Sequence, residues 1–134
     1  MIFLLDTNFC VQYLRGRNPL VRQRLAAKPV QEIRLCSIVL AELYIGTLRS
    51  AQPAKNRAAV DQFAAPYAVL PFDTAAAGIC AIVRHDLESK GTPIGPYDLQ
   101  IAAIALAQGC TLVTHNVGEF SRVPGLLIED WEVP

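Results

Sequence analysis

A short apolar run near the start of the chain, residues 2–5, ends at an acidic residue, Asp6. A continuous apolar run of this length is typical of a strand that is buried on both faces of a parallel sheet. Thr7 and Asn8 are suited to cap a following helix, which should end near Gly16. The run therefore predicts the first β-α unit of a fold in which helices cover a parallel sheet.

Strand and helix patterns alternate along the rest of the chain. Strands are predicted over residues 33–36, 69–71, 110–114 and 126–128, and helices over residues 19–28, 38–48, 53–67, 74–91 and 96–109. Ser37 is expected to cap the helix that starts at residue 38. This alternation predicts an α/β fold with a central, mostly parallel sheet of four or five strands flanked by helices. The chain has 134 residues and no linker or internal repeat, so we expect residues 1–134 to form a single domain.

Two acidic residues interrupt the apolar faces of predicted helices. Asp98 lies in the first turn of the helix that Pro96 opens, where the helix dipole favours an anion. Its neighbours at helical spacing include Ile101 and Ala102, so its carboxylate points to an apolar face. Glu42 is placed in the same way in the helix over residues 38–48. A carboxylate on such a face needs a partner, which points to a functional site.

The topology brings these acids to one place. Ligands of parallel α/β sheets bind outside the carboxyl ends of the strands. Asp6 follows the first strand directly, and the helices that carry Glu42 and Asp98 start from the same edge. Glu119 follows the strand that ends at Thr114. We therefore expect Asp6, Glu42, Asp98 and Glu119 to converge at this edge.

Converging carboxylates need a cation or protons. Two unit charges ~4 Å apart repel by about 4 kcal/mol at an effective dielectric constant of about 20. Because the ligands are all carboxylate oxygens, Mg²⁺ or Mn²⁺ is the expected ion. A divalent ion held in this way suits phosphoryl chemistry. The acids thus predict a metal-dependent nuclease.

The net charge of the chain is zero, but the charges are unevenly distributed. Residues 1–60 hold nine Lys or Arg and three acidic residues, whereas residues 61–134 hold three and nine. The basic first part is suited to bind a polyanion. The candidate RNA-binding residues are Arg15, Arg17, Arg22 and Arg24. The sequence leaves open whether these arginines bind RNA or a protein partner.

Several motifs in a fixed order resemble those of PIN-domain ribonucleases, especially the VapC toxins of bacterial toxin–antitoxin pairs. They are Leu4–Asn8, Ala41–Gly46, Ile94–Asp98 followed by Ile101–Ala103, Leu112–Asn116, Glu119–Phe120 and Val123–Leu126. The resemblance covers the chain from end to end. It implies a PIN-like three-layer sandwich.

The resemblance also implies roles for the site residues. Asp6, Glu42 and Asp98 would be metal ligands, and Glu119 would complete the acidic pocket. Thr114 would support the carboxylates by hydrogen bonding, as would Asn8. Many relatives carry an aspartate where this chain has Asn116, so either Asn116 or Glu119 completes the site.

The activity implied is that of an endoribonuclease with Mg²⁺ or Mn²⁺ that cuts structured RNA such as tRNA. The products would carry 5′-phosphate and 3′-hydroxyl ends. The partners implied are a cognate antitoxin that covers the active site and a second copy of the chain in a homodimer, within a larger toxin–antitoxin assembly. The sequence shows no signal peptide or membrane segment, so a cytoplasmic location is expected.

Three other functions are compatible with parts of the sequence. One is a non-catalytic RNA- or protein-binding module on a PIN scaffold. A second is a metal-free ribonuclease that uses His85 and His115 as acid and base, although we expect His85 to lie on the surface and His115 to contact the site or its substrate. The third, a phosphoacceptor receiver domain, is disfavoured because no lysine follows Lys90.

Overall fold

The computed structural model describes residues 1–134 and contains one five-stranded sheet. All four strand pairs are parallel, and the order is β3-β2-β1-β4-β5. The strands are β1 (Phe3–Leu5), β2 (Ile33–Cys36), β3 (Ala68–Leu70), β4 (Thr111–Val113) and β5 (Ile128–Glu129). The predicted mostly parallel sheet is confirmed, with β1 at its centre.

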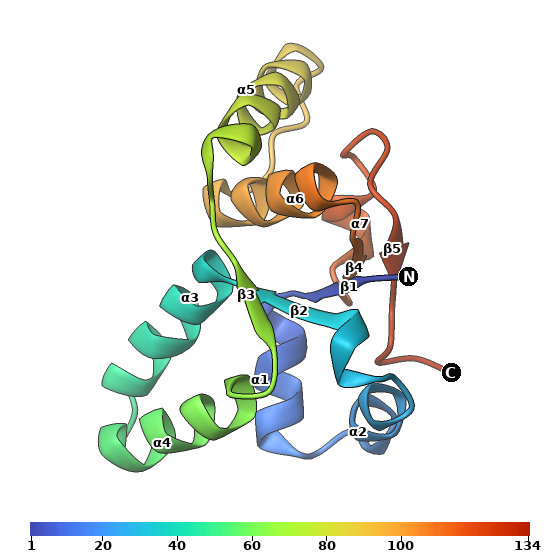
Figure 1. The fold of residues 1–134 in the computed structure, drawn as a ribbon. Coiled ribbons are helices and arrows are strands. Elements are labelled where there is room, and N and C mark those ends of the chain that lie inside the picture. The colour runs from blue at the N-terminus through green and yellow to red at the C-terminus, as the bar shows by residue number, and fades with distance from the viewer.

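Helices cover both faces of the sheet, which makes the predicted three-layer sandwich (Figure 1). Helices α5 and α6 lie on one side, α1 and α2 lie on the other, and α3 and α4 form a hairpin beside the strand ends. The helices are α1 (Thr7–Arg15), α2 (Pro19–Ala26), α3 (Ser37–Leu48), α4 (Pro53–Ala64), α5 (Thr74–Ser89), α6 (Pro96–Gln108) and α7 (Val117–Phe120), with a 3-10 turn at Val30–Glu32. No helix combines the length and the apolar character that a membrane crossing would require.

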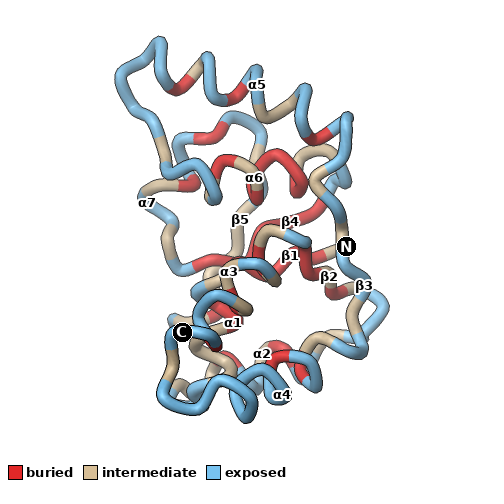
Figure 2. Tube along the Cα trace, turned by 90° about the vertical axis from the view of Figure 1, so that its left-hand side faces the viewer, coloured by how far each residue is buried: buried red, intermediate tan, exposed pale blue.

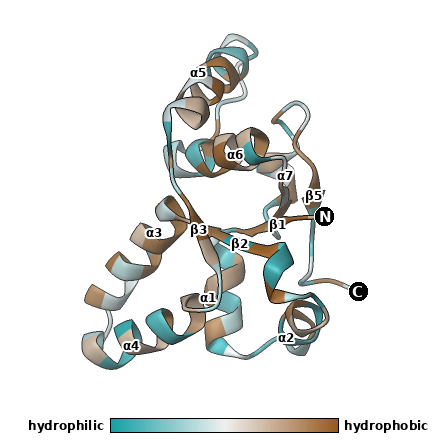
Figure 3. Ribbon diagram, in the orientation of Figure 1, coloured by the Kyte–Doolittle hydropathy of each residue, from teal (hydrophilic) through white to brown (hydrophobic).

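The core follows the strands and α6. Figure 2 shows buried residues along β1, β4 and α6, and Figure 3 shows hydrophobic residues over much of the same elements. Every residue of β1 and β4 is buried, as are residues 101–105 of α6. Trp131 closes the core from the C-terminal segment, because its ring lies 5.1 Å from that of Phe3 and 5.6 Å from that of Phe9. Burial of both faces of β1 explains its continuous apolar sequence.

The structure corrects two predicted helix caps. The cap of α1 is Asp6, not Thr7 or Asn8, because Asp6 has an extended backbone and its Oδ1 accepts a 2.8 Å hydrogen bond from the Phe9 N–H. Ser37 is the first residue of α3 rather than its cap; Cys36 holds the cap position without a side-chain hydrogen bond. In both cases the cap lies one or more residues earlier, directly at the strand end.

Candidate active site

Asp6 lies at the carboxyl end of β1, buried beneath the acidic edge of the sheet. Its backbone N–H donates to the Val113 carbonyl of β4, and its side chain is 3% exposed. Burial raises the pKa of Asp6 to about 6, and the charges of Glu132 and Glu42 add to this. Hydrogen bonds from Thr114 and from the Phe9 N–H oppose the rise. Asp6 is therefore both a helix cap and a carboxylate that resists ionisation.

Glu42 lies in the second turn of α3 and is half-buried. Its Oε1 accepts a 2.7 Å hydrogen bond from the Thr7 hydroxyl at the start of α1. This contact gives Thr7 a role that the sequence did not reveal, because it depends on how α1 packs against α3. Helices α1 and α3 thus hold Glu42 at the side of Asp6, whose pKa its charge raises.

Asp98 and Glu119 flank the backbone of Gly95. The Gly95 N–H donates a 2.8 Å hydrogen bond to Glu119 Oε1. A carbon placed at the Cβ position of Gly95 would lie 3.7 Å from that same oxygen and 4.0 Å from Asp98 Oδ2. Asp98 comes from the first turn of α6 and Glu119 from the short helix α7. Two segments about twenty residues apart thus present their carboxylates to one backbone position.

The electrostatics link all four predicted acids. The pKa of Asp98 is raised to about 6, first by burial and then by the charges of Glu119, Asp6 and Glu42. The pKa of Glu119 is lowered, because the Gly95 N–H and the Asn116 side chain donate to its carboxylate. Glu119 is therefore held in the ionised form, whereas Asp6 and Asp98 resist ionisation.

Asn116 and Thr114 form a short hydrogen-bonded link between the acids. The Asn116 N–H donates to Thr114 Oγ1 at 3.0 Å, and the Asn116 side-chain amide donates to Glu119 Oε2 at 2.9 Å. The buried Thr114 hydroxyl in turn donates to the Asp6 carboxylate. Asn116 thus orients Glu119, which an aspartate in its place could not do by donation. Asn8 is exposed and makes no hydrogen bond to a carboxylate.

No basic side chain forms an ion pair with these acids, although the charge of Arg122 also helps to lower the pKa of Glu119. The ion pairs of the structure are Arg57–Asp61, Arg84–Glu88, Lys90–Asp86 and His115–Asp130. An all-oxygen set of this kind fits Mg²⁺ or Mn²⁺. The four acids do not form a tight cage. The structure has one group of three potential ligand atoms within 4.8 Å of one another, and it consists of His115, Asp130 and Glu132 instead. Such spacing fits an ion that keeps part of its water shell.

The four candidate arginines lie in different surroundings. Arg22 donates to the Tyr13 carbonyl at 2.8 Å and lies 4.4 Å above the Tyr13 ring. Arg24 donates to the Asp130 carbonyl at 3.1 Å. Arg15 and Arg17 are exposed and make no such bond. The structure therefore gives Arg22 and Arg24 contacts within the protein and leaves Arg15 and Arg17 free.

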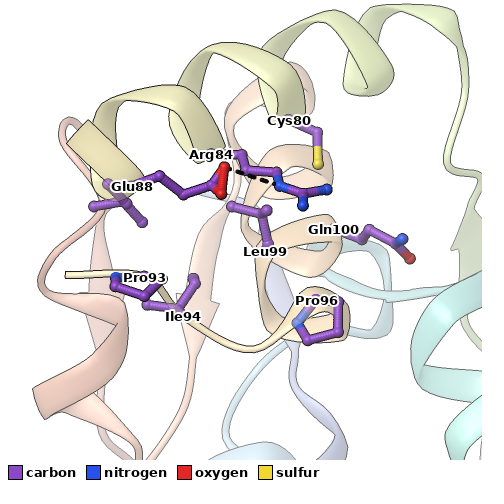
Figure 4. Close-up of a pocket in the computed structure, with 9 residues that line it drawn as sticks. Cys80, Arg84, Glu88, Pro93, Ile94, Pro96, Leu99 and Gln100 are labelled. Atoms are coloured by element: carbon purple, nitrogen blue, oxygen red, sulfur yellow. Dashed lines mark hydrogen bonds and ion pairs between the residues drawn. The ribbon is translucent and has the colours of Figure 1, made fainter. Parts of the chain in front are cut away.

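Two cavities differ in their relation to the acids. One of about 380 Å³ opens between α1, α3 and α4, and its lining includes Glu42, Arg15 and Gly46 with apolar side chains. The other, of about 310 Å³, lies between α5 and the start of α6 (Figure 4). Its wall carries the Arg84–Glu88 ion pair and none of the four acids. Of these two cavities, only the first is lined by one of the four acids, Glu42.

Comparison with known proteins gives a consistent result. The PIN domain family matches residues 3–126. The tRNA(fMet)-specific endonuclease VapC of Salmonella typhimurium is 41% identical over 131 residues, which cover 96% of this chain and 97% of the relative. Ribonuclease VapC2 of Rickettsia felis is 38% identical over 135 residues, covering 98% and 99%.

Solved structures agree in fold. The DNA-bound VapBC of Salmonella typhimurium has a TM-score of 0.92 and 40% identity, and covers 98% of both chains. VapBC2 of Rickettsia felis, bound to a DNA fragment from its promoter, has a TM-score of 0.91 and 37% identity, covering 98% of this chain and 99% of that one. The relatives are named ribonucleases, which favours the nuclease over a non-catalytic binding module.

Proposed function

Because this chain belongs to the PIN-domain family and is a VapC-like ribonuclease of the toxin–antitoxin type, we propose that it hydrolyses RNA with the help of Mg²⁺ or Mn²⁺. The observation that carries the metal requirement is the set of four electrostatically coupled carboxylates, none of which forms an ion pair. When bound, the ion would activate water and stabilise the charge that develops on the phosphate.

The residues proposed to hold the ion are Asp6, Glu42, Asp98 and Glu119. Thr7 fixes Glu42 by a hydrogen bond, and Gly95 and Asn116 fix the two oxygens of Glu119. Ligands that are already oriented lose little freedom on metal binding. We propose that the products carry 5′-phosphate and 3′-hydroxyl ends, because water rather than the RNA 2′-hydroxyl is the nucleophile.

The proposed substrate is tRNA. The Salmonella typhimurium relative is named as specific for tRNA(fMet) and matches almost the whole chain. Arg15 and Arg17, exposed and without a hydrogen-bond partner, are the arginines that we assign to the RNA phosphates. Arg22 and Arg24 donate hydrogen bonds to the Tyr13 and Asp130 carbonyls. We therefore assign them to stabilising the binding surface rather than to binding phosphate.

The protein partner is a cognate antitoxin, as in the VapBC complexes to which this fold is similar. We propose that an antitoxin segment fills the cavity between α1, α3 and α4, because that cavity is apolar and reaches Glu42. A segment seated there would cover one side of the acid cluster. We further propose that the chain acts as a single domain, pairs as a homodimer within the toxin–antitoxin assembly, and works in the cytoplasm where tRNA is found.

Cleavage of bulk tRNA by purified protein tests the proposal. Incubation with Mg²⁺, with Mn²⁺ and with EDTA, followed by mapping of the product ends, should give cuts with 5′-phosphates only when metal is present. Asp98→Asn should abolish the cuts, while Asp86→Asn on α5, in a surface ion pair, should leave them unchanged. Cuts in EDTA that leave cyclic phosphates would refute the metal mechanism.

A further inference from the structure

His115 lies in the chain between two residues that contact different acids of the cluster. The preceding residue, Thr114, hydrogen-bonds to Asp6, and the following residue, Asn116, hydrogen-bonds to Glu119. The backbone around His115 is therefore fixed by contacts to both sides of the site. Its side chain is nevertheless 58% exposed.

One nitrogen of the His115 ring is held in place. Nδ1 lies 2.9 Å from Asp130 Oδ2. Asp130 is itself fixed, because its other oxygen accepts from the Glu132 N–H at 3.0 Å and its carbonyl accepts from Arg24 at 3.1 Å. Nε2 has no hydrogen-bond partner. The ring is thus oriented by the protein and offers its second nitrogen to solvent at the edge of the site.

We propose that His115 binds the RNA substrate, with Nε2 donating a hydrogen bond to a phosphate oxygen beside the acid cluster. The inference rests on the proposed nuclease function. Carboxylates repel phosphates, so a site built from acids needs a donor at its rim to hold the substrate. An imidazolium supplies both a positive charge and an N–H.

The protonation state follows from the groups that face the ring. The hydrogen bond to Asp130 raises the pKa of His115, as do the charges of Asp130, Glu132 and Asp6; its slight burial has the opposite effect. When Nδ1–H donates to Asp130, Nε2 carries a hydrogen only in the protonated ring. Substrate binding through Nε2 should therefore weaken as the pH rises through the raised pKa of His115.

A bound cation is the competing explanation for this cluster. The ligand atoms of His115, Asp130 and Glu132 lie within 4.8 Å of one another, and Glu132 Oε2 is buried without a hydrogen-bond partner. However, two of these ligand atoms, His115 Nδ1 and Asp130 Oδ2, already bond to each other. The ring is also largely exposed, which suits a large ligand better than an enclosed ion. The two explanations predict different behaviour of a His115 variant.

The experiment measures binding of labelled bulk tRNA in EDTA and cleavage with Mg²⁺, for the wild type and for His115→Gln. At about pH 6 the variant should bind tRNA about tenfold more weakly, the effect of losing one charge-assisted hydrogen bond. At about pH 8.5 the two proteins should differ by less than about twofold, because the positive charge of the imidazolium is then absent from both. In cleavage, KM should rise while kcat changes by less than about threefold.

Two further variants make the test specific. His85→Gln removes the exposed histidine of α5 and should leave binding unchanged at both pH values. Asp130→Asn keeps a hydrogen-bond acceptor for Nδ1 but removes the negative charge. It should move the pH at which tRNA binding weakens to a lower value, a shift that a purely structural role would not produce.

Equal tRNA affinity of the wild type and His115→Gln at about pH 6 would overturn the inference, as would the loss of one bound Mn²⁺ in a calorimetric titration of the variant. Thermal melting verifies that each variant is folded. A wild type that cleaves tRNA with metal while His115→Gln behaves identically would refute only this inference. A folded wild type that neither binds nor cleaves tRNA would instead refute the proposed function.

Discussion

Asn116 donates its side-chain amide to Glu119 Oε2, while the Gly95 N–H donates to Oε1 of the same carboxylate. Both oxygens of Glu119 are therefore oriented before any metal binds. Asn116 thus acts on a neighbouring acid rather than as an acid itself. These two donors also lower the pKa of Glu119, which keeps its carboxylate ionised.

Asn116→Ala should reduce the rate of RNA cleavage by about tenfold or more and raise the Mg²⁺ concentration for half-maximal activity, because Glu119 loses a donor. Asn8→Ala is the matched control, since Asn8 is exposed and makes no hydrogen bond to the acids. Cleavage rates over a series of Mg²⁺ concentrations provide the measurement. Equal effects of the two substitutions would contradict the role of Asn116.

The Thr7 hydroxyl is predicted to be needed for Glu42. Thr7→Val keeps the shape of the side chain and removes the 2.7 Å hydrogen bond to Glu42 Oε1. We expect about a tenfold loss of metal affinity or activity. Thr74→Val alters the corresponding first residue of α5, which makes no hydrogen bond to an acid, and should have no effect. Metal affinity by calorimetry distinguishes the two.

Asp98 should make the folded protein less stable at neutral pH in the absence of metal. Its pKa is about 6 in the folded protein against an ordinary value of 3.8, so folding disfavours its charged form. This unfavourable contribution is absent at low pH and appears as the pH rises through about 4 to 6. In EDTA near neutral pH, Asp98→Asn should raise stability by about 1 kcal/mol, allowing for solvent screening, or a few degrees in Tm.

The same substitution should give no such gain near pH 3, which is below both pKa values, so that Asp98 is largely protonated in the unfolded and the folded protein. Asp86→Asn, in a surface ion pair with Lys90, should not raise Tm at either pH. Thermal melts at the two pH values provide the test. An Asp98→Asn protein that is less stable than the wild type in EDTA at neutral pH would show that the cluster is not repulsive.

The arginines should separate by the salt dependence of RNA binding. Arg17→Ala should lower the slope of log affinity against log salt concentration by about one, because one phosphate contact is lost. Arg22→Ala should leave that slope unchanged and lower Tm instead, since Arg22 bonds to the Tyr13 carbonyl and covers its ring. Filter binding of labelled tRNA at several salt concentrations measures both slopes.

Filling the cavity beside Glu42 should weaken antitoxin binding. Nothing lies within 4 Å of a Cβ placed at Gly46, which lines the cavity, so the side chain of Gly46→Leu would start in open space. Gly78→Leu is a matched control on α5, with equally open space at its Cβ position. Both should preserve the fold, but only Gly46→Leu should slow or weaken complex formation. Undiminished binding by Gly46→Leu would place the antitoxin elsewhere.

Features that depend on local sequence could be predicted, and features that depend on packing could not. The buried strands followed from apolar runs such as residues 2–5, and the edge that collects Asp6 and Glu42 followed from parallel topology. Helix α7, with four residues, is too short to leave a periodic pattern. The Thr7–Glu42 bond depends on how two helices approach each other, so no spacing in the sequence reveals it.

The position of β1 at the centre of the sheet has a consequence for synthesis. Its partners include β4, and the rings of Phe3 and Phe9 pack against Trp131, so the first elements to be translated contact some of the last. Thr114, which holds Asp6, is also made more than one hundred residues later. A ribosome must therefore complete most of the chain before the acids can be assembled. Such long-range contacts delay folding, so a growing chain on the ribosome lacks the assembled acid cluster.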